Sequence, residues 1–466
     1  MGFCGFPFLL GFLPLTLCGF SLASRAGASA AKIWLIAMSL LFYGIGADGF
    51  LPLLVMSVAG NFWLLTRMHG SARAGRWAAF GVAANLAVLG WFKYLTPDPA
   101  VPLGLSFFTF TQIGCLLHHA GGDVRPPRAT DYALFAAFFP GLTAGPILNA
   151  HEMLPQVGRT GGWRLTNGDL AAGTGFFIIG LLKKTVLADP LAGVVASGFA
   201  APDQLTLLPA WQAACSFSLQ LYFDFSGYSD MAIGLARMCG LHYPDNFDQP
   251  YRAGSVIEYW QRWHMSLTRF VMTHVHTPLT LAVLRWRRAR GLPIGVAAQR
   301  SLSGFACMIA VPVGVTLMLI SLWHGAAWTF LVFGLLHTAF LLVNHLWRLH
   351  RLPALPGIAG VALTYLCVLG ASVVFRAASL SGAGSVLAGM AGWHGFSVSG
   401  MRGVAGACWL AGLYAIVWLA PSTRRIMQGE RPVWRPSPGW AIAMGCAATI
   451  GVLAAGGTGE FLYVRF

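Results

Sequence analysis

Residues 303–322 read S-G-F-A-C-M-I-A-V-P-V-G-V-T-L-M-L-I-S-L, a stretch without a single charged side chain. As an α-helix this stretch is about 30 Å long, which matches the hydrocarbon core of a membrane. Similar runs recur at 3–23, 29–47, 50–66, 77–95, 101–119, 131–149, 170–197, 206–237, 327–347, 357–375, 403–420 and 439–457. They predict about 11 to 13 membrane crossings, some of them re-entrant.

The bulk composition agrees with a membrane protein. Hydrophobic residues make up 56% of the 466 and charged residues 10%, whereas a soluble domain has about 25% charged residues. Soluble globular and disordered chains are therefore excluded. The apolar runs are long and continuous rather than alternating, which excludes a β-barrel and predicts an all-α polytopic membrane protein.

The positions of the basic residues indicate the membrane topology. The net charge is +15, but the arginines lie in the connections between apolar runs, where the positive-inside rule places them in the cytoplasm. We therefore expect no nucleic-acid partner. The basic connections are Arg25, 67–76, 125–128, 285–290, 348–351 and 424–435.

The nine cysteines form no C-x-x-C pair, and most lie inside apolar runs. They predict neither a disulfide framework nor a zinc site. No basic segment precedes the first apolar run, so we interpret it as the first membrane helix rather than a cleaved signal.

No soluble linker divides the chain, so we expect one membrane domain over 1–466, with peripheral helices in 1–95, a motif-bearing core in 101–347 and further helices in 357–466. Residues 239–300 are the longest part without a clean span. Within them, apolar residues of 255–270 recur at three- and four-residue spacing, which predicts an interfacial or buried amphipathic helix.

Polar groups inside apolar segments are expensive and mark candidate functional sites. His324 lies in Ser321-Leu-Trp-His-Gly-Ala-Ala-Trp328, between two long apolar runs. Its imidazole titrates near neutral pH and can act as a general base. The alternative is an interfacial histidine in an aromatic belt.

A second candidate is Glu258-Tyr-Trp-Gln-Arg-Trp-His264. Glu258 and Arg262 are four residues apart and can pair on one helical face, so an anchoring ion pair is the favoured interpretation for them. His264 lies off that face and is the more open candidate.

Two weaker candidates complete the set. Asp224 and Asp230 lie six residues apart in an apolar segment. Over acid–base work we favour a structural role, in which a broken helix has polar groups that satisfy one another or pair with Lys183 and Lys184. The segment Thr273-His-Val-His276 carries an H-x-H pair, but no third ligand lies at a suitable spacing, so we predict no metal site. The chain has no G-x-S-x-G, phosphate-loop or H-E-x-x-H motif.

Seven segments match known sequence motifs. They are Val101–Phe110 (V-P-L-G-L-S-F-F-T-F), Phe138–Ile147 (F-F-P-G-L-T-A-G-P-I), Gly180–Thr185 (G-L-L-K-K-T), Tyr222–Gly234 (Y-F-D-F-S-G-Y-S-D-M-A-I-G), Pro244–Tyr251 (P-D-N-F-D-Q-P-Y), Tyr259–Leu267 (Y-W-Q-R-W-H-M-S-L) and Leu322–Ala326 (L-W-H-G-A). In this order they resemble the membrane-bound O-acyltransferase family, and within it the branch that acetylates bacterial alginate.

The resemblance implies helices around a central tunnel, with the family's catalytic histidine at His324 and its second functional histidine at His264. Residues that would bind substrate or line the tunnel are Trp323, Trp263, Asp224, Ser226, Asp230, Asn246, Gln249, Glu258 and Arg262. The implied donor is acetyl-CoA, used as a substrate with no bound cofactor.

The resemblance further implies a bacterial inner-membrane protein that works with a periplasmic acetyltransferase and with polysaccharide-synthesis proteins. The acceptor would be an alginate- or cellulose-like polymer. The chain departs from the branch after Leu267, where an aromatic segment ending in P-L-G-G is replaced by 271–280. This departure leaves open the acceptor and the roles of His274 and His276.

Two other functions fit parts of the pattern. D-alanyl or another acyl transfer from a carrier protein to a cell-envelope polymer keeps the family but changes the substrate. A passive transporter of polymer or substrate would explain the polar segment around Asp224, although it gives no reason for His324.

Overall fold

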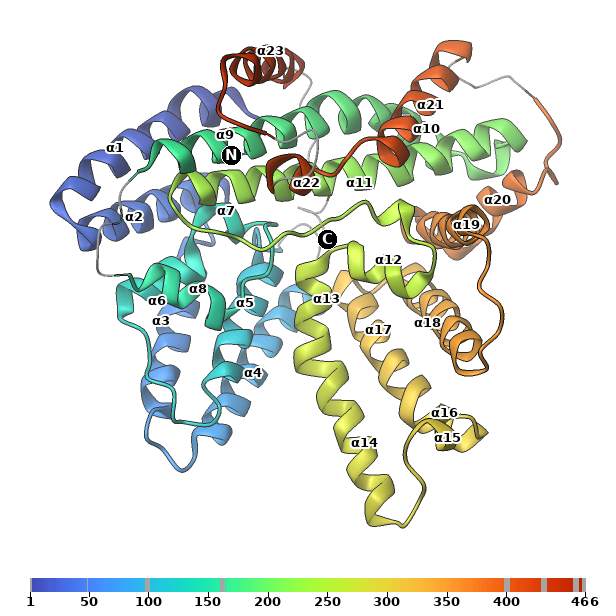
Figure 1. Ribbon diagram of the computed structural model, residues 1–466, viewed down its shortest axis with the longest axis horizontal. Coiled ribbons are helices and arrows are strands. Elements are labelled where there is room, and N and C mark those ends of the chain that lie inside the picture. The colour runs from blue at the N-terminus through green and yellow to red at the C-terminus, as the bar shows by residue number, and fades with distance from the viewer. Residues whose placement is uncertain are drawn as a thin grey trace. The chain divides into compact units, whose positions relative to one another are not determined.

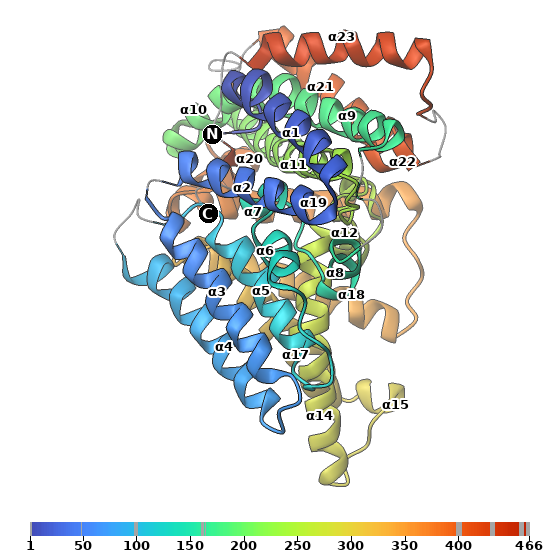
Figure 2. The ribbon, with the colours of Figure 1, turned by 90° about the vertical axis from the view of Figure 1, so that its left-hand side faces the viewer.

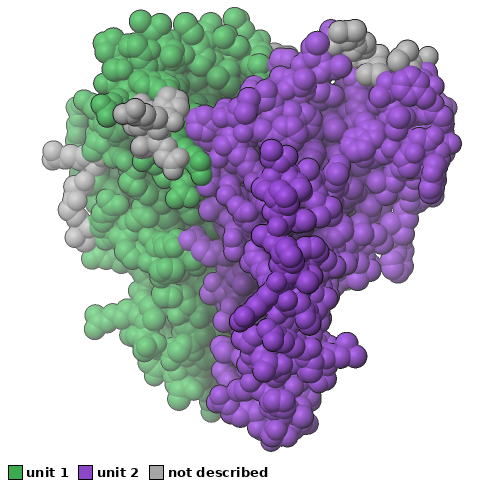
Figure 3. All heavy atoms as spheres, turned by 45° about the vertical axis from the view of Figure 1, so that its right-hand side comes forward, with its two compact units in different colours: residues 1–189, 223–246, 423–466 green, residues 190–222, 247–422 purple. Residues whose placement is uncertain are grey.

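The computed structural model describes residues 2–47, 49–96, 101–159, 163, 165–397, 403–428, 434–455 and 461–462. These residues form α-helices joined by short π- and 3₁₀-helical segments, and no strand occurs among them. The helices divide into two compact units, coloured separately in Figure 3. Unit 1 comprises residues 1–189, 223–246 and 423–466, and unit 2 comprises residues 190–222 and 247–422.

Unit 1 holds the N-terminal helices and the last two helices (Figure 1). Its α-helices are α1 (Leu13–Ala26), α2 (Ala28–Gly46), α3 (Leu51–Met68), α4 (Ala74–Gly90), α5 (Leu105–His118), α6 (Ala129–Ala137), α7 (Phe139–Leu142), α8 (Ala150–Val157), α9 (Asn167–Leu182), α22 (Thr423–Gln428) and α23 (Pro438–Ala454). The π-helical segments η1 (Pro7–Phe12) and η3 (Lys183–Ala188) adjoin α1 and α9.

Unit 2 carries both histidine motifs. Its α-helices are α10 (Ala192–Ala200), α12 (Val256–Arg262), α13 (Met265–Val271), α14 (Thr277–Ala289), α15 (Val296–Gln299), α16 (Leu302–Phe305), α17 (Val311–His324), α18 (Trp328–Leu349), α19 (Gly357–Arg376), α20 (Leu380–Met390) and α21 (Gly403–Leu419). The long helix α11 (Leu207–Met238) contributes its first half to unit 2 and its second half to unit 1.

Eight helical segments of the described chain are long and apolar enough to cross a membrane. They are Pro7–Ala26, Ala28–Gly46, Leu51–Met68, Ala74–Leu95, Asn167–Ala200, Leu302–His324, Trp328–Leu349 and Gly357–Arg376. Four shorter apolar helices accompany them, at Leu105–His118, Leu380–Met390, Ala405–Leu419 and Pro438–Ala454. The predicted all-α membrane fold is confirmed, and most predicted spans agree with a helix to within a few residues.

The predicted span over 131–149 is wrong. Its residues form the short helices α6 and α7, which meet at Phe138, whose φ and ψ of −64° and 120° are extended. Pro140 follows within the first turn of α7, where its missing N–H costs no hydrogen bond. A helix continued from α6 through Pro140 would lose the hydrogen bond to the Ala136 carbonyl and bring the proline ring against it. Hydrophobicity alone did not reveal this break.

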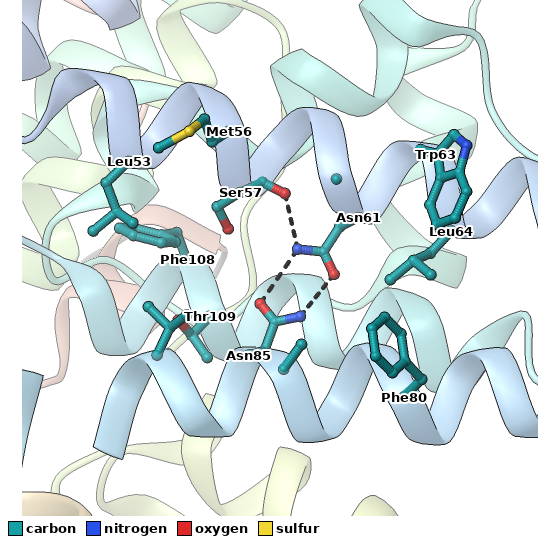
Figure 4. A pocket seen from close by; sticks show the side chains of 13 residues that line it. Leu53, Met56, Ser57, Asn61, Trp63, Leu64, Phe80, Asn85, Phe108 and Thr109 are labelled. Carbon is teal, nitrogen blue, oxygen red and sulfur yellow. Dashed lines mark hydrogen bonds between the residues drawn. The ribbon is translucent and has the colours of Figure 1, made fainter. Parts of the chain in front are cut away.

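Polar side chains join α3 to α4 inside unit 1. Asn61 and Asn85 each donate an amide hydrogen bond to the other's side-chain oxygen, at 3.3 and 2.7 Å, and Asn61 also bonds the carbonyl of Ser57 (Figure 4). Figure 2 shows the two helices running side by side. Amide pairs of this kind hold neighbouring membrane helices together, because lipid offers no competing hydrogen bonds.

Candidate active site

The predicted amphipathic helix over 255–270 is interrupted at its centre. Helix α12 ends at Arg262 and α13 begins at Met265, and His264 between them has φ 44° and ψ 54°, in the left-handed region. A residue other than glycine pays about 1 kcal/mol or more for this conformation. The prediction of one continuous helix is therefore wrong, and the break turns His264 away from the helical repeat that the sequence suggested.

The surroundings of His264 are apolar. Its side chain is 1% exposed, and burial lowers the pKa of the imidazole to about 3. Because the charged form is disfavoured without water, the ring is neutral at physiological pH. A neutral imidazole has one N–H donor and one acceptor nitrogen, so it can both give and take a hydrogen bond.

His324 is the last residue of α17 and is also buried. The next residue, Gly325, has a φ of 158°, and a Cβ there would lie 2.9 Å from the Phe330 ring. Only glycine fits this turn. The His324 imidazole packs against Trp323 and Phe375, with ring centroids 4.7 and 5.0 Å apart.

Trp323 connects the two histidines. Its indole lies 6.4 Å from the His264 ring and 4.7 Å from the His324 ring, measured between centroids. Unit 2 therefore brings together two imidazoles that are sixty positions apart in the sequence. Trp323 therefore lies against both histidine rings, while the chemical roles of all three residues stay predictions.

Trp263 belongs to an aromatic stack next to this place. Its indole is nearly parallel to the rings of Tyr259 and Tyr251, at centroid distances of 5.7 and 6.3 Å, and Phe247 packs edge-on against it. Stacks of this kind add about 0.5–1.5 kcal/mol per pair beyond simple burial. The stack holds in place the backbone segment that carries His264.

His337 on α18 was missed by the sequence analysis. It is 1% exposed, and the Trp260 indole Nε1 donates a 3.3 Å hydrogen bond to its Nδ1. This bond ties α12 to α18. A histidine near the middle of the apolar run 327–347 was the signal that could have revealed it.

Glu258 and Arg262 form the ion pair that the sequence favoured. Arg262 Nη2 lies 2.6 Å from Glu258 Oε1, and Glu258 Oε2 accepts a 2.8 Å hydrogen bond from the Gly254 amide. Gln249 donates a 2.6 Å bond to the Ala420 carbonyl. These contacts anchor the segments on either side of α12, so we assign the three side chains to the framework of unit 2.

The acidic candidates lie in unit 1 and are engaged by lysines. Lys184 Nζ lies 2.6 Å from Asp224 and 2.7 Å from Asp189, and Lys183 Nζ lies 2.6 Å from Asp230. Of the two structural alternatives, the structure shows the pairing with Lys183 and Lys184, but the predicted break is wrong, because α11 runs uninterrupted through this segment. Neutralised pairs satisfy buried charges and leave these carboxylates poor candidates for acid–base work.

Two further predicted residues accompany this cluster. Asn246 donates a 3.0 Å hydrogen bond to Ser229 Oγ. The Ser226 hydroxyl is fully buried and has no hydrogen-bond partner within the described residues. Neither position lies in the same unit as the two histidines.

The H-x-H pair lies in the π-helical segment η7 (Met272–His276). In the described ranges, no group of three or more His, Cys, Asp or Glu side chains is arranged to hold a metal ion. Burial lowers the pKa of both the His274 and His276 imidazoles.

Comparison of the sequence with known proteins identifies its family. Residues 92–292 match the model of MBOAT, the membrane-bound O-acyltransferase family. The chain is 33% identical to the peptidoglycan O-acetyltransferase of Helicobacter pylori over 441 residues, covering 84% of this chain and 80% of that one. The chain belongs to the membrane-bound O-acyltransferase family.

Other relatives of this O-acyltransferase are named for different acceptors. It is 31% identical to the "Probable alginate O-acetylase AlgI" of Azotobacter vinelandii, covering 86% of this chain and 80% of the relative. It is 24% identical to the teichoic acid D-alanyltransferase of Streptococcus thermophilus, covering 65% and 73%. Membership of an acyltransferase family argues against the alternative of a passive transporter.

Proposed function

We propose that the protein transfers an acetyl group from acetyl-CoA towards a hydroxyl of a cell-envelope or extracellular polysaccharide. The relatives that are more than 30% identical are named as O-acetyltransferases of peptidoglycan or alginate. The observation that carries the proposal is the meeting of His264 and His324 at Trp323 in a buried, aromatic part of unit 2.

His324 is the proposed general base. Its imidazole takes the proton of the acceptor hydroxyl as the oxygen attacks the thioester carbonyl, a step worth about 10²–10⁴-fold in rate. A C–O bond forms and the C–S bond breaks, and the proton passes to the departing coenzyme A thiolate. The products are the O-acetyl ester and free coenzyme A.

His264 is the proposed oxyanion partner. Its neutral ring carries a single N–H, which can donate to the carbonyl oxygen as negative charge develops there. The rigid turn between α12 and α13 holds the ring in place before substrate arrives. Such preorganised donors stabilise the transition state because no reorientation is needed during the reaction.

The proposed setting is the bacterial inner membrane. The donor enters from the cytoplasm, where the basic connections would attract the phosphates of acetyl-CoA. The acceptor lies on the opposite side, and we propose that a separate periplasmic acetyltransferase completes transfer to the polymer. Alginate, cellulose and peptidoglycan are all chemically suitable, since each presents sugar hydroxyls.

Release of free thiol from acetyl-CoA by the purified protein in nanodiscs tests the proposal. We expect His324→Ala to abolish release, measured with an acceptor sugar or periplasmic partner present. His69→Ala, an exposed histidine between α3 and α4, is the matched control and should keep the wild-type rate. Full activity in His324→Ala would remove that residue from the mechanism.

The likeness to a D-alanyltransferase supports a second candidate, aminoacyl transfer from a carrier protein to an envelope polymer. Labelled donors, added to membranes that contain the protein, distinguish the two candidates. Label from acetyl-CoA in the polymer fraction supports the first candidate, whereas label only from a D-alanyl-loaded carrier protein supports the second.

A further inference from the structure

A cavity of about 490 Å³ opens in unit 2 beside the N-terminus of α12, between the C-terminal half of α18 and the N-terminal half of α19. On α18, one face supplies Phe340, Val343, Asn344, Trp347 and Arg348, which recur every three or four residues. The cavity is of the size that holds a small amphiphilic ligand. It is separate from the histidines, which do not line it.

The walls of this cavity change from apolar to basic along the helices. Phe340, Leu363 and Cys367 line one end, while Arg348 and Arg351 line the other. Arg348 lies eight residues after Phe340 on the same face, which is about 12 Å along a helix. A ligand that fits must therefore carry an anionic head and an apolar tail.

The two guanidinium groups are available for an anion. Arg348 Nη2 donates to Ser255 Oγ at 3.4 Å, and neither Arg348 nor Arg351 pairs with a carboxylate in the described part of the chain. Glu258, on the adjoining α12, is engaged by Arg262 and the Gly254 amide. The positive charge at this end is thus not compensated by a carboxylate of the described residues.

The helices that form the cavity also determine its depth. Helices α18 and α19 are both candidate membrane spans, and the basic connection between them is expected at the cytoplasmic surface. Trp347 beside Arg348 fits the interfacial position of tryptophan. The arginines then lie at headgroup level and the apolar end lies at the depth of acyl chains.

A second cavity, in unit 1, provides the contrast. It measures about 350 Å³, lies between α3, α4 and α5, and has no charged side chain in its lining (Figure 4). The two amide side chains in its lining, Asn61 and Asn85, are hydrogen-bonded to each other. Apolar walls are therefore common to both cavities, and only the α18–α19 cavity adds an anion-binding end.

We propose that the α18–α19 cavity binds one anionic phospholipid, with its phosphate on Arg348 and Arg351 and an acyl chain along Val343 and Leu363. Basic pockets between membrane helices on the cytoplasmic side recognise lipid headgroups in this way. This site is independent of the proposed acetyl transfer.

Native mass spectrometry of the delipidated full-length protein in detergent tests the proposal. The probes are dioleoyl-phosphatidylglycerol, dioleoyl-phosphatidylcholine and coenzyme A. We expect one phosphatidylglycerol per chain, with affinity about 30-fold weaker in the double variant R348Q/R351Q, because each surface arginine contributes to anionic lipid binding. The double variant R73Q/R76Q, which removes two exposed arginines at the N-terminus of α4, is the matched control and should bind as the wild type does.

A steric variant keeps the test independent of charge and of the folding of the double variant. Leu363→Trp fills the acyl end while leaving both arginines, and it should weaken phosphatidylglycerol binding as well. Equal binding of phosphatidylcholine would overturn the anionic site. Displacement of phosphatidylglycerol by equimolar coenzyme A would instead assign the arginines to a soluble phosphate, and unchanged binding in R348Q/R351Q would also overturn the proposal.

Discussion

Two polar clusters lie among the apolar helices of this acyltransferase, and their buried polar groups are stabilised in different ways. In unit 1, Lys184 sits between Asp189 and Asp224 within 2.7 Å of each. In unit 2, the rings of His264 and His324 lie against aromatic rings, and burial keeps the His264 imidazole neutral. A buried charge must be paired, whereas a buried imidazole can discard its charge.

This difference teaches which cluster is free to do chemistry. Breaking a buried ion pair leaves an uncompensated charge, so the lysine–aspartate cluster is committed to holding helices together. An imidazole that rests neutral needs no counter-ion, so its ring nitrogens are left to give and take hydrogen bonds. The predictions below test that division, starting with the largest effect.

Lys184→Met should lower the stability of the fold most. Removing the ammonium leaves the carboxylates of Asp189 and Asp224 buried without their shared cation, which costs about 3–5 kcal/mol. The melting temperature in detergent measures the loss. Arg237→Gln breaks the half-buried pair with Asp169, and we expect about 1 kcal/mol or less there.

His264→Gly should reduce catalysis by about 10²-fold, since it removes the proposed oxyanion donor. Glycine accepts the left-handed backbone at this position, so the turn between α12 and α13 is retained. His264→Asn also tolerates that backbone and keeps a donor, and we expect it to recover part of the rate. Equal kcat in wild type and His264→Gly would assign His264 to structure alone.

The pH dependence of stability should carry a signature of His264. Its folded pKa of about 3 lies below the ordinary value of 6.5, so the unfolded chain binds a proton that the folded chain does not over that interval. Stability is therefore full above pH 6.5 and falls as the pH drops towards 3, by about 2 kcal/mol at pH 5.

Melting temperatures of wild type and His264→Asn between pH 5 and 8 measure this effect. The variant should lose less stability on acidification, because it lacks the group that takes up a proton on unfolding. Parallel curves for the two proteins would show that His264 is not buried in its neutral form.

Asn85→Leu should have the smallest effect. It removes both amide bonds with Asn61, and such interhelical bonds in membranes are worth about 1 kcal/mol. A shift of a few degrees in melting temperature, with thiol release per folded molecule unchanged, is the expected result. Loss of activity at unchanged stability would link this helix pair to the reaction.

Sequence reasoning recovered the membrane fold and the pairing of the acids, because hydrophobic length and lysine–aspartate complementarity are local or chemically obligatory. It placed His264 and His324 in one site only through the family resemblance, since nothing in their spacing brings them together. The structure adds Trp323 as the side chain that both rings contact.

The breaks in the helices could not be predicted in the same way. His264 adopts a left-handed conformation without a glycine to announce it, and burial among aromatic residues offsets the local cost. Similarly, Phe138 ends α6 inside an unbroken apolar run. Hydrophobic periodicity reports which face is buried, but it says little about where a chain turns within a buried region.

The rate of thiol release from acetyl-CoA per folded molecule, compared between His324→Gln and Lys184→Met, tests the division of roles most directly. The account predicts that His324→Gln loses at least about 100-fold in rate at an unchanged melting temperature. Lys184→Met should melt lower yet release thiol at close to the wild-type rate while folded. The reverse pattern, an active His324→Gln and an inactive but stable Lys184→Met, would contradict it.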